Sequence, residues 1–214
     1  MISIARLAGR KAIALLSDMN QPLGFAVGNV LELREAIETL HGEGPQDFRE
    51  HCLEVAAHML VIGGICPSVS EGKQMSQQAL DQGQAWNRFR LLIKTQEGDV
   101  SFVDHPEKLP KAPIVETVLA PASGYLHTIH ARIVGEMAVA LGAGREKKTD
   151  TIDPAVGVMI LHKVGDAIQQ GEPLCVIHAN RSAILPQARQ ALLKAHSIVD
   201  HPVAPLPLFY GAIS

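Results

Sequence analysis

Apolar residues recur with two different spacings along this chain, and the change of spacing divides the sequence near residue 104. In residues 1–104 they return every three or four positions, which is typical of helices with one buried face. The stripe formed by Val30, Leu33, Ile37 and Leu40 is an example. Helices are therefore predicted to begin at residues 29, 45, 70 and 84.

A strand is predicted before these helices, where Ala12-Ile13-Ala14-Leu15-Leu16 forms a continuous apolar run. Such a run is typical of a parallel strand that is buried on both faces. A loop at 17–28 joins this strand to the helix at 29–40, and Asn29 and Glu32 have the spacing of a capping box at the start of that helix. Residues 1–104 are thus predicted to belong to an α/β domain with a parallel sheet.

Beyond residue 113 the pattern changes to short β segments separated by turns, which indicates an α+β domain at 114–214. Between the two halves, Pro106, Pro110 and Pro113 favour extended backbone at the residues before them, so a linker is predicted at 105–113. In the second half, strands are predicted at 114–119, 124–129, 156–162 and 174–178, and helices at 131–141 and 188–195.

Composition excludes several classes of function without assigning one. Hydrophobic residues at 47% and charged residues at 19% are typical of a globular protein. A net charge of −3 gives no electrostatic reason to expect nucleic acid or an anionic membrane as a partner. Cys52, Cys66 and Cys175 are too few and too widely spaced for a disulfide framework. With no apolar run of membrane-spanning length, the sequence predicts a cytoplasmic protein.

Two stretches taken together indicate a family. One is the loop at 17–29, Ser-Asp-Met-Asn-Gln-Pro-Leu-Gly-Phe-Ala-Val-Gly-Asn, with the helix behind it. The other runs from Leu141-Gly142-Ala143-Gly144-Arg145-Glu146-Lys147-Lys148 through Ile152-Asp153 to Val156-Gly157. The chain resembles the pyrimidine-nucleoside phosphorylases and thymidine phosphorylases essentially end to end, but only over the C-terminal half of such an enzyme. Met1 would then fall inside a helix, just before a core strand.

The resemblance implies both a fold and an activity. The fold would be the C-terminal part of a parallel α/β domain followed by an α/β-hammerhead domain, which is similar to a barrel-sandwich. The activity would be reversible phosphorolysis, in which phosphate converts uridine or thymidine to the free base and a pentose 1-phosphate. Such a pentosyltransferase of nucleoside salvage would form a homodimer and use no organic cofactor. The family's phosphate- and base-binding groups would lie in the missing N-terminal half. We therefore assign no catalytic and no substrate-binding residue to this chain, and expect it to be inactive alone.

The resemblance also implies a potassium site. Its ligands in this chain would be the backbone carbonyls of Leu23 and Ala26 and the carboxylate of Glu35. Oxygen ligands of this kind suit a hard cation. The remaining ligands would come from an upstream glycine-rich loop, so this chain would hold half of the site. Without the resemblance, Glu35 is better interpreted as a solvated helix acid beside Glu38.

Other motifs favour structural roles. The stretch Gly142-Ala143-Gly144-Arg145 lacks the spacing of a phosphate-binding P-loop and is interpreted as a loop held by Arg145, Asp150 and Asp153. The histidine pairs His127/His130 and His51/His58 are too poorly placed to share a metal ion. The turns in 165–174 resemble half of a biotinyl or lipoyl carrier motif, but neither Lys147 nor Lys163 has the setting of a carrier lysine.

Three interpretations remain open at this stage. The chain is a truncated phosphorylase, one subunit of a split phosphorylase whose N-terminal half is a separate chain, or a non-catalytic binding or carrier-like module. The predicted strand at 12–16 lies only a few residues after Met1, which favours truncation.

Overall fold

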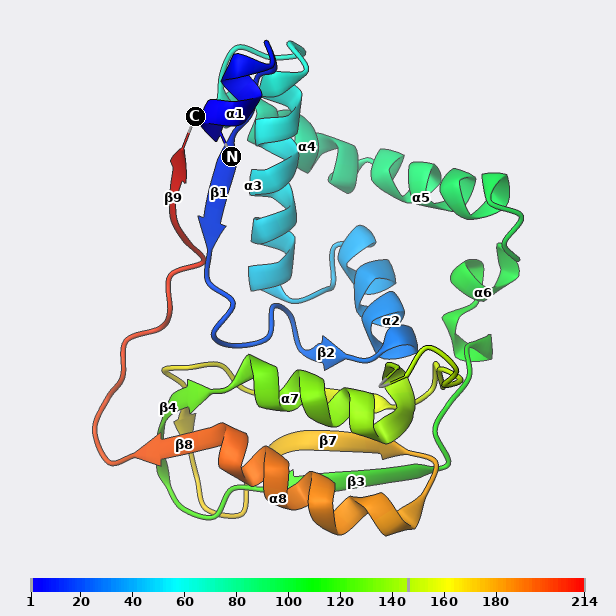
Figure 1. Cartoon of the computed structure of the whole chain (residues 1–214), viewed down its shortest axis with the longest axis vertical. Helices are drawn as coiled ribbons and strands as arrows, with labels where there is room; N and C mark the ends of the chain where they lie inside the picture. The colour runs from blue at the N-terminus through cyan, green and yellow to red at the C-terminus, as the bar shows by residue number, and fades with distance from the viewer. Residues whose placement is uncertain (1, 146, 214) are drawn as a thin grey trace. The chain divides into compact units, whose positions relative to one another are not determined.

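The computed structural model describes residues 2–145 and 147–213 (Figure 1). These residues form two compact units, each built from separate stretches of sequence. Unit 1 comprises Met1–Asp18, Ile37–Val100 and Pro207–Ser214, and unit 2 comprises Met19–Ala36 and Ser101–Leu206. This division differs from the linear one into 1–104 and 114–214, because the segment Met19–Ala36 belongs with the second half of the chain.

Unit 1 is mainly helical. Its long helices carry buried residues on one side only, as their apolar spacing predicted. Gly72 allows α4 to approach α3 closely, since a Cβ at this position would lie 2.8 Å from the Ala57 carbonyl oxygen. The helices of this unit are α1 (Ile2–Leu7), α3 (Gln46–Ile62), α4 (Val69–Asp81) and α5 (Gln84–Thr95).

The capping residues of unit 1 follow the predicted starts with one correction. Helix α3 begins at Gln46, one residue after the predicted start, with Pro45 as its N-cap. Helix α4 is capped by Ser68 rather than Ser70, because the Ser68 hydroxyl accepts a hydrogen bond from the Glu71 amide at 3.2 Å. An N-cap side chain satisfies an amide that has no partner within the helix, so this bond fixes where α4 begins.

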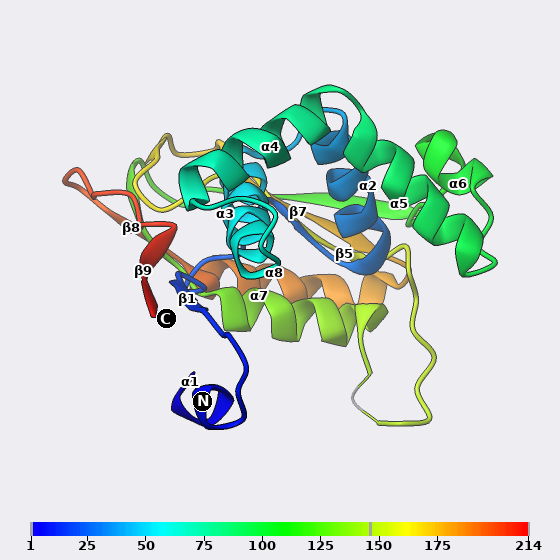
Figure 2. The same ribbon diagram turned by 90° about the horizontal axis from the view of Figure 1, so that it is seen from above.

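The strand predicted at 12–16 is present as β1 (Ala14–Ser17), but its environment was predicted wrongly. It pairs antiparallel with β9 (Phe209–Ile213), with Ala14 opposite Ile213, and it is only half-buried. Figures 1 and 2 show the two strands side by side. Every strand pair in the described part of the chain is antiparallel, so a parallel sheet is not seen there. The apolar run at 12–16 predicted the strand, whereas its partner lies almost two hundred residues away.

Unit 2 contains two antiparallel sheets. The first has the order β2-β5-β7-β3, and the second has the order β6-β4-β8. The strands of the first sheet are β2 (Ala26–Val27), β5 (Gly157–Ile160), β7 (Pro173–Ala179) and β3 (Ile114–Leu119). Those of the second are β6 (Ala167–Ile168), β4 (Gly124–Ile129) and β8 (His196–Val199). The strands predicted at 114–119 and 124–129 are confirmed at those bounds.

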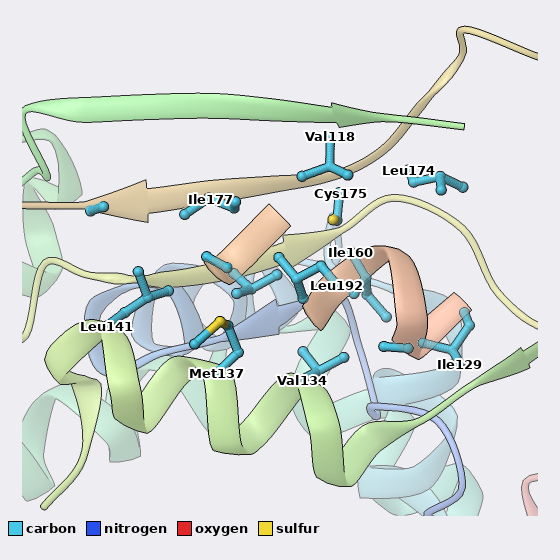
Figure 3. Close-up of a cluster of buried hydrophobic side chains, with 14 of the residues drawn as sticks. Val118, Ile129, Val134, Met137, Leu141, Ile160, Leu174, Cys175, Ile177 and Leu192 are labelled. Carbon is cyan, nitrogen blue, oxygen red and sulfur yellow. The ribbon is translucent and has the colours of Figure 1, made fainter. Parts of the chain in front are cut away.

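Two helices, α7 (Ala131–Ala138) and α8 (Leu185–Ala195), lie alongside each other over the four-stranded sheet (Figure 1). Figure 3 shows their inward side chains meeting those of the strands, including Val134, Met137 and Leu192 from the helices and Ile160 and Ile177 from β5 and β7. All five are at least 96% buried. The core of unit 2 therefore lies between α7, α8 and the four-stranded sheet.

The predicted linker at 105–113 lies within unit 2. It follows α6 (Ser101–Asp104) and begins with a single 3₁₀ turn at Pro106–Lys108. Leu109 and Ala112 are buried, and the Leu109 carbonyl accepts a hydrogen bond from the Arg34 guanidinium at 3.1 Å. The prolines give this segment an irregular backbone, yet it is packed against its neighbours.

Candidate cation-binding loop

The candidate site is the loop before β2, together with the first half of α2 (Asn29–Leu40). Strand β2 pairs antiparallel with β5, with Ala26 opposite Met159, and the Ile160 amide donates to the Phe25 carbonyl at 2.8 Å. Hydrogen-bonded and non-bonded pairs alternate along an antiparallel ladder. Because Phe25 is in a bonded pair, the amide and carbonyl of Ala26 point away from β5.

Glu35 lies on the side to which Ala26 points. Its Oε1 atom accepts hydrogen bonds from the Phe25 amide at 2.7 Å and from the Ala26 amide at 3.0 Å. The side chain is only 7% exposed, whereas Glu38, one turn further on, is exposed. The interpretation of Glu35 as a solvated helix acid is therefore wrong. A carboxylate buried this deeply needs bonded donors, and the loop amides provide two of them.

Gly24 makes this contact possible. Its φ of +65° lies in the left-handed region that side chains rarely adopt. A Cβ built on Gly24 would lie 2.2 Å from Glu35 Oε2, which is far inside van der Waals contact. The loop can therefore fold over the Glu35 carboxylate only because residue 24 has no side chain.

The capping of α2 differs from the predicted capping box. The Glu32 carboxylate accepts a hydrogen bond from the Gly28 amide at 2.9 Å, while the Asn29 side chain donates to the Ala143 carbonyl at 2.8 Å. Gly28 and Gly157 face each other across β2 and β5, and a Cβ on Gly157 would lie 2.3 Å from the Val27 carbonyl oxygen. This close approach ties the start of α2 to the sheet of unit 2.

Lys163 completes the loop, and the sequence analysis did not find it. Its ammonium donates to the Pro22 carbonyl at 2.8 Å and also to the Gly24 carbonyl. The same nitrogen lies 5.1 Å from the centre of the Phe25 ring, within the range of a cation–π contact. Lys163 was considered only as a carrier lysine. The lysine and its carbonyl partners are about 140 residues apart, so no local pattern joins them.

Among the residues predicted as ligands, Ala26 contacts Glu35 through its amide rather than through the carbonyl predicted as a ligand, and Leu23 lies in the same loop. The set consists of hard oxygen donors and includes one buried carboxylate, which is the donor chemistry that a monovalent cation requires. The residues present therefore fit such an ion.

Comparison with known proteins places this geometry in a family. Residues 125–199 match the model of the pyrimidine nucleoside phosphorylase C-terminal domain. The chain is 43% identical over 214 residues to a pyrimidine-nucleoside phosphorylase of Geobacillus stearothermophilus. It is 40% identical over 205 residues to a pyrimidine-nucleoside phosphorylase of Staphylococcus aureus strain bovine RF122 / ET3-1. The chain belongs to the pyrimidine-nucleoside phosphorylase family.

The matches cover 100% and 96% of this chain, but only 49% and 47% of the two relatives. The chain thus spans about half the length of the curated relatives it matches, and the matched family model is that of their C-terminal domain. The resemblance inferred from the loop at 17–29 and the stretch at 141–157 is confirmed.

The described residues contain no group of three or more His, Cys, Asp or Glu side chains that could hold a metal ion. Burial raises the pKa of the Cys175 thiol to about 12, so this side chain is an inert part of the core. None of the described helices combines the length and the apolarity needed to cross a bilayer.

The loop at 141–153 is held by backbone contacts. The Asp150 carboxylate accepts from the Lys147 amide at 2.8 Å. The Asp153 carboxylate accepts from the Ala155 amide at 3.0 Å and from the Asn180 side chain. Gly142, with φ +114°, ends the helical stretch that begins with α7. These contacts are consistent with the structural interpretation of this glycine-containing stretch.

Proposed function

We propose that this chain is the C-terminal part of an enzyme that catalyses reversible phosphorolysis of pyrimidine nucleosides. Orthophosphate would attack the anomeric carbon of uridine or thymidine, releasing the base and forming a pentose 1-phosphate. The observation that supports this most strongly is identity of 40–43% to pyrimidine-nucleoside phosphorylases over 96–100% of the chain. The chemistry is of the kind that depends on positioning and charge stabilisation.

In this proposal the chain provides scaffold and a cation-binding loop, while the groups that contact phosphate and base lie outside it. The second half of the chain would be the family's α/β-hammerhead domain, and the first half would complete a parallel α/β domain. The full enzyme would be a cytoplasmic homodimer that binds a pyrimidine nucleoside and phosphate, with no organic cofactor and no nucleic-acid or membrane partner. The isolated chain would be inactive.

Potassium would be held by the carbonyls of Leu23 and Ala26 and by the carboxylate of Glu35. When bound, it would supply a fixed positive charge that holds these oxygens together. The chain's own residues prepare the loop for this role. Gly24 folds the loop over Glu35, and the Phe25 and Ala26 amides orient the carboxylate. Substituting Glu35 by Gln keeps the size of the side chain and removes the charge.

The test is phosphate-dependent release of uracil or thymine from uridine or thymidine. The purified chain is assayed alone and after mixing with a separately expressed N-terminal half of the Geobacillus stearothermophilus relative. We expect base release only from the mixture and only with phosphate. The N-terminal half alone, and the mixture without phosphate, are the controls. Turnover by the chain alone would contradict the assignment of all substrate groups to the missing half.

The relatives are about twice as long as this chain, which also fits a split enzyme whose N-terminal half is a separate chain. The mixing experiment covers this case, because a complementing half restores activity in either arrangement. If the folded chain shows no activity in any mixture, a non-catalytic binding module becomes the better interpretation.

A further inference from the structure

The Lys163 ammonium is held rigidly beside the candidate cation loop. Lys163 begins a tight turn in which its amide donates to the Asp166 carboxylate at 2.8 Å and the Asp166 amide donates to its carbonyl at 3.1 Å. The next residue, Val164, donates its amide to the Gln21 side chain at 2.9 Å. The lysine is thus anchored at its own backbone and at its ammonium, so its charge has a fixed position.

Glu35 and Lys163 both contact Gly24. The Glu35 carboxylate packs against the position where a Gly24 side chain would be, and the Lys163 ammonium binds the Gly24 carbonyl. Glu35 and Lys163 thus carry opposite formal charges, and both side chains contact the same residue, Gly24. Both side chains are largely withdrawn from water, since Glu35 is 7% exposed and Lys163 is half-buried. Their formal charges sum to zero before any ion binds.

The neutral sum matters because repulsion between a bound ion and the ammonium grows with the charge of the ion. At the same position, the repulsion energy between the Lys163 ammonium and a divalent ion is twice that for a monovalent ion. Without Lys163, the Glu35 carboxylate and the loop carbonyls would form an acidic oxygen site, which also suits calcium. The ammonium thus acts against divalent ions more strongly than against monovalent ones.

We propose that Lys163 is a specificity-determining residue that makes the loop at 21–26 select monovalent over divalent cations. This inference rests on the proposed cation-binding role of the loop. The same side chain also holds the Pro22 and Gly24 carbonyls, so a purely structural role predicts something different. If Lys163 only holds the loop in place, its loss lowers the affinity of the loop for monovalent and divalent ions by similar factors. If its charge determines selectivity, its loss changes the ratio of the two affinities.

The experiment measures protection by cations of the loop amides of the full chain after mixing with the N-terminal half of the Geobacillus stearothermophilus relative, which would supply the remaining ligands. Hydrogen exchange of the Phe25 and Ala26 amides is followed during titration with potassium chloride or calcium chloride, with choline chloride keeping ionic strength constant. Lys163→Gln removes the charge and keeps a hydrogen-bond donor, while Lys163→Arg keeps the charge. Lys194→Met, an exposed lysine of α8 in the same unit, is the matched control.

We expect potassium to protect the wild-type loop at lower concentrations than calcium does. In Lys163→Gln, the affinity for calcium relative to potassium should rise by about tenfold or more, because one repelling charge has gone. Lys163→Arg and Lys194→Met should keep the wild-type ratio. An unchanged ratio in Lys163→Gln, or tighter calcium than potassium binding by the wild-type chain, would overturn the inference. The second result does not depend on whether the variant folds.

Glu35→Gln separates this inference from the proposal on which it rests. If potassium protects the wild-type loop and Glu35→Gln abolishes the protection, the cation site stands and the Lys163 variants alone decide the selectivity. If no cation protects the wild-type loop in the mixture with the N-terminal half, both the cation site and its selectivity fail. Phosphorolysis by the mixed halves tests the family activity separately from either result.

Discussion

At the scale of single residues, the loop depends most directly on Gly24. Its left-handed backbone and its contact with the Glu35 carboxylate both exclude a side chain. Gly171 offers a matched comparison in the same unit, since its φ is +84° and a Cβ there would meet nothing within 4 Å. The pair separates the cost of backbone strain from the cost of a steric clash.

We expect Gly171→Ala to lower the free energy of unfolding of unit 2 by about 1 kcal/mol, from strain alone. Gly24→Ala should lower it by about 3 kcal/mol or more, because the carboxylate must also move and lose its amide donors. Urea unfolding followed by circular dichroism measures both values. Equal effects of the two substitutions would show that displacing the Glu35 carboxylate does not lower the free energy of unfolding.

His196 predicts how stability changes with pH. Burial lowers the pKa of this imidazole, with a smaller contribution from His162 in the same direction and an opposing one from the Leu192 carbonyl. Its Nδ1 bonds to that carbonyl at 2.7 Å, and Nε2 is buried with no hydrogen-bond partner in the part of the chain that the structure describes. Protonation would place an unpaired charge in the core.

As the pH falls below about 6.5, His196 takes up a proton in the unfolded chain before it does so in the folded one. This favours unfolding, so the free energy of unfolding should decrease between about pH 7 and about pH 5.5. His196→Asn, whose amide can still donate to Leu192, should flatten this part of the profile. His127→Asn, on the exposed face of β4, is the control and should leave the slope unchanged.

The residue scale also shows where sequence reasoning reached its limit. The family resemblance located Glu35 and Ala26, and the structure brings them into contact. Periodicity alone placed Glu35 on a solvated face, because a sequence does not show that a glycine loop will cover a helix. Lys163 was missed as a loop contact for a related reason, since its partners are carbonyls, and every residue has one.

At the scale of elements, the four-stranded sheet of unit 2 forms one side of its core. Leu174 on β7 is 1% exposed, and Leu119 on the neighbouring strand β3 is 51% exposed. Leu174→Ala should lower the free energy of unfolding by about 2–5 kcal/mol, because it leaves a cavity in a packed interior. Leu119→Ala removes the same atoms from a solvated site, so its effect should be within about 0.5 kcal/mol of zero.

Thermal or urea unfolding of the two leucine variants checks this expectation. A small effect of Leu174→Ala would mean that α8 and the sheet can close over the missing side chain. A large effect of Leu119→Ala would instead indicate that the outer face of β3 is covered in the folded protein.

Elements with a strong local signal were predicted well. Helix α2 has the predicted bounds, and β3 and β4 do as well. The short strands β2, β6, β8 and β9 were not predicted, because two to five residues carry little periodicity. Their existence depends on partners elsewhere in the chain, and pairing is a property of the fold rather than of the segment.

At the scale of the whole molecule, each unit is discontinuous in sequence. Unit 1 needs β9 to complete its small sheet, where the Tyr210 hydroxyl also donates to the buried Asp18 carboxylate. Deletion of residues 207–213 should therefore expose β1 and leave the sheets of unit 2 intact. Hydrogen exchange should show faster exchange at Ala14–Ser17 and unchanged exchange in β5 and β7.

The control for this deletion is Tyr210→Phe, which removes one hydroxyl and keeps β9. Tyr210→Phe should lower the free energy of unfolding by about 1–3 kcal/mol, because the Asp18 carboxylate loses one of its hydrogen-bond donors. Faster exchange in β5 and β7 after the deletion would show that unit 2 depends on the end of the chain.

The pairing of β1 with β9 has a consequence for how the protein is made. During translation, β1 is synthesised almost two hundred residues before β9, since Ala14 pairs with Ile213. The segments of unit 2 are all complete by Leu206, before β9 has been synthesised. Until β9 has been synthesised, the β1 edge that pairs with it stays unpaired. An unpaired strand edge is a template for pairing with another chain. Slow translation between Leu206 and β9 would prolong that exposure.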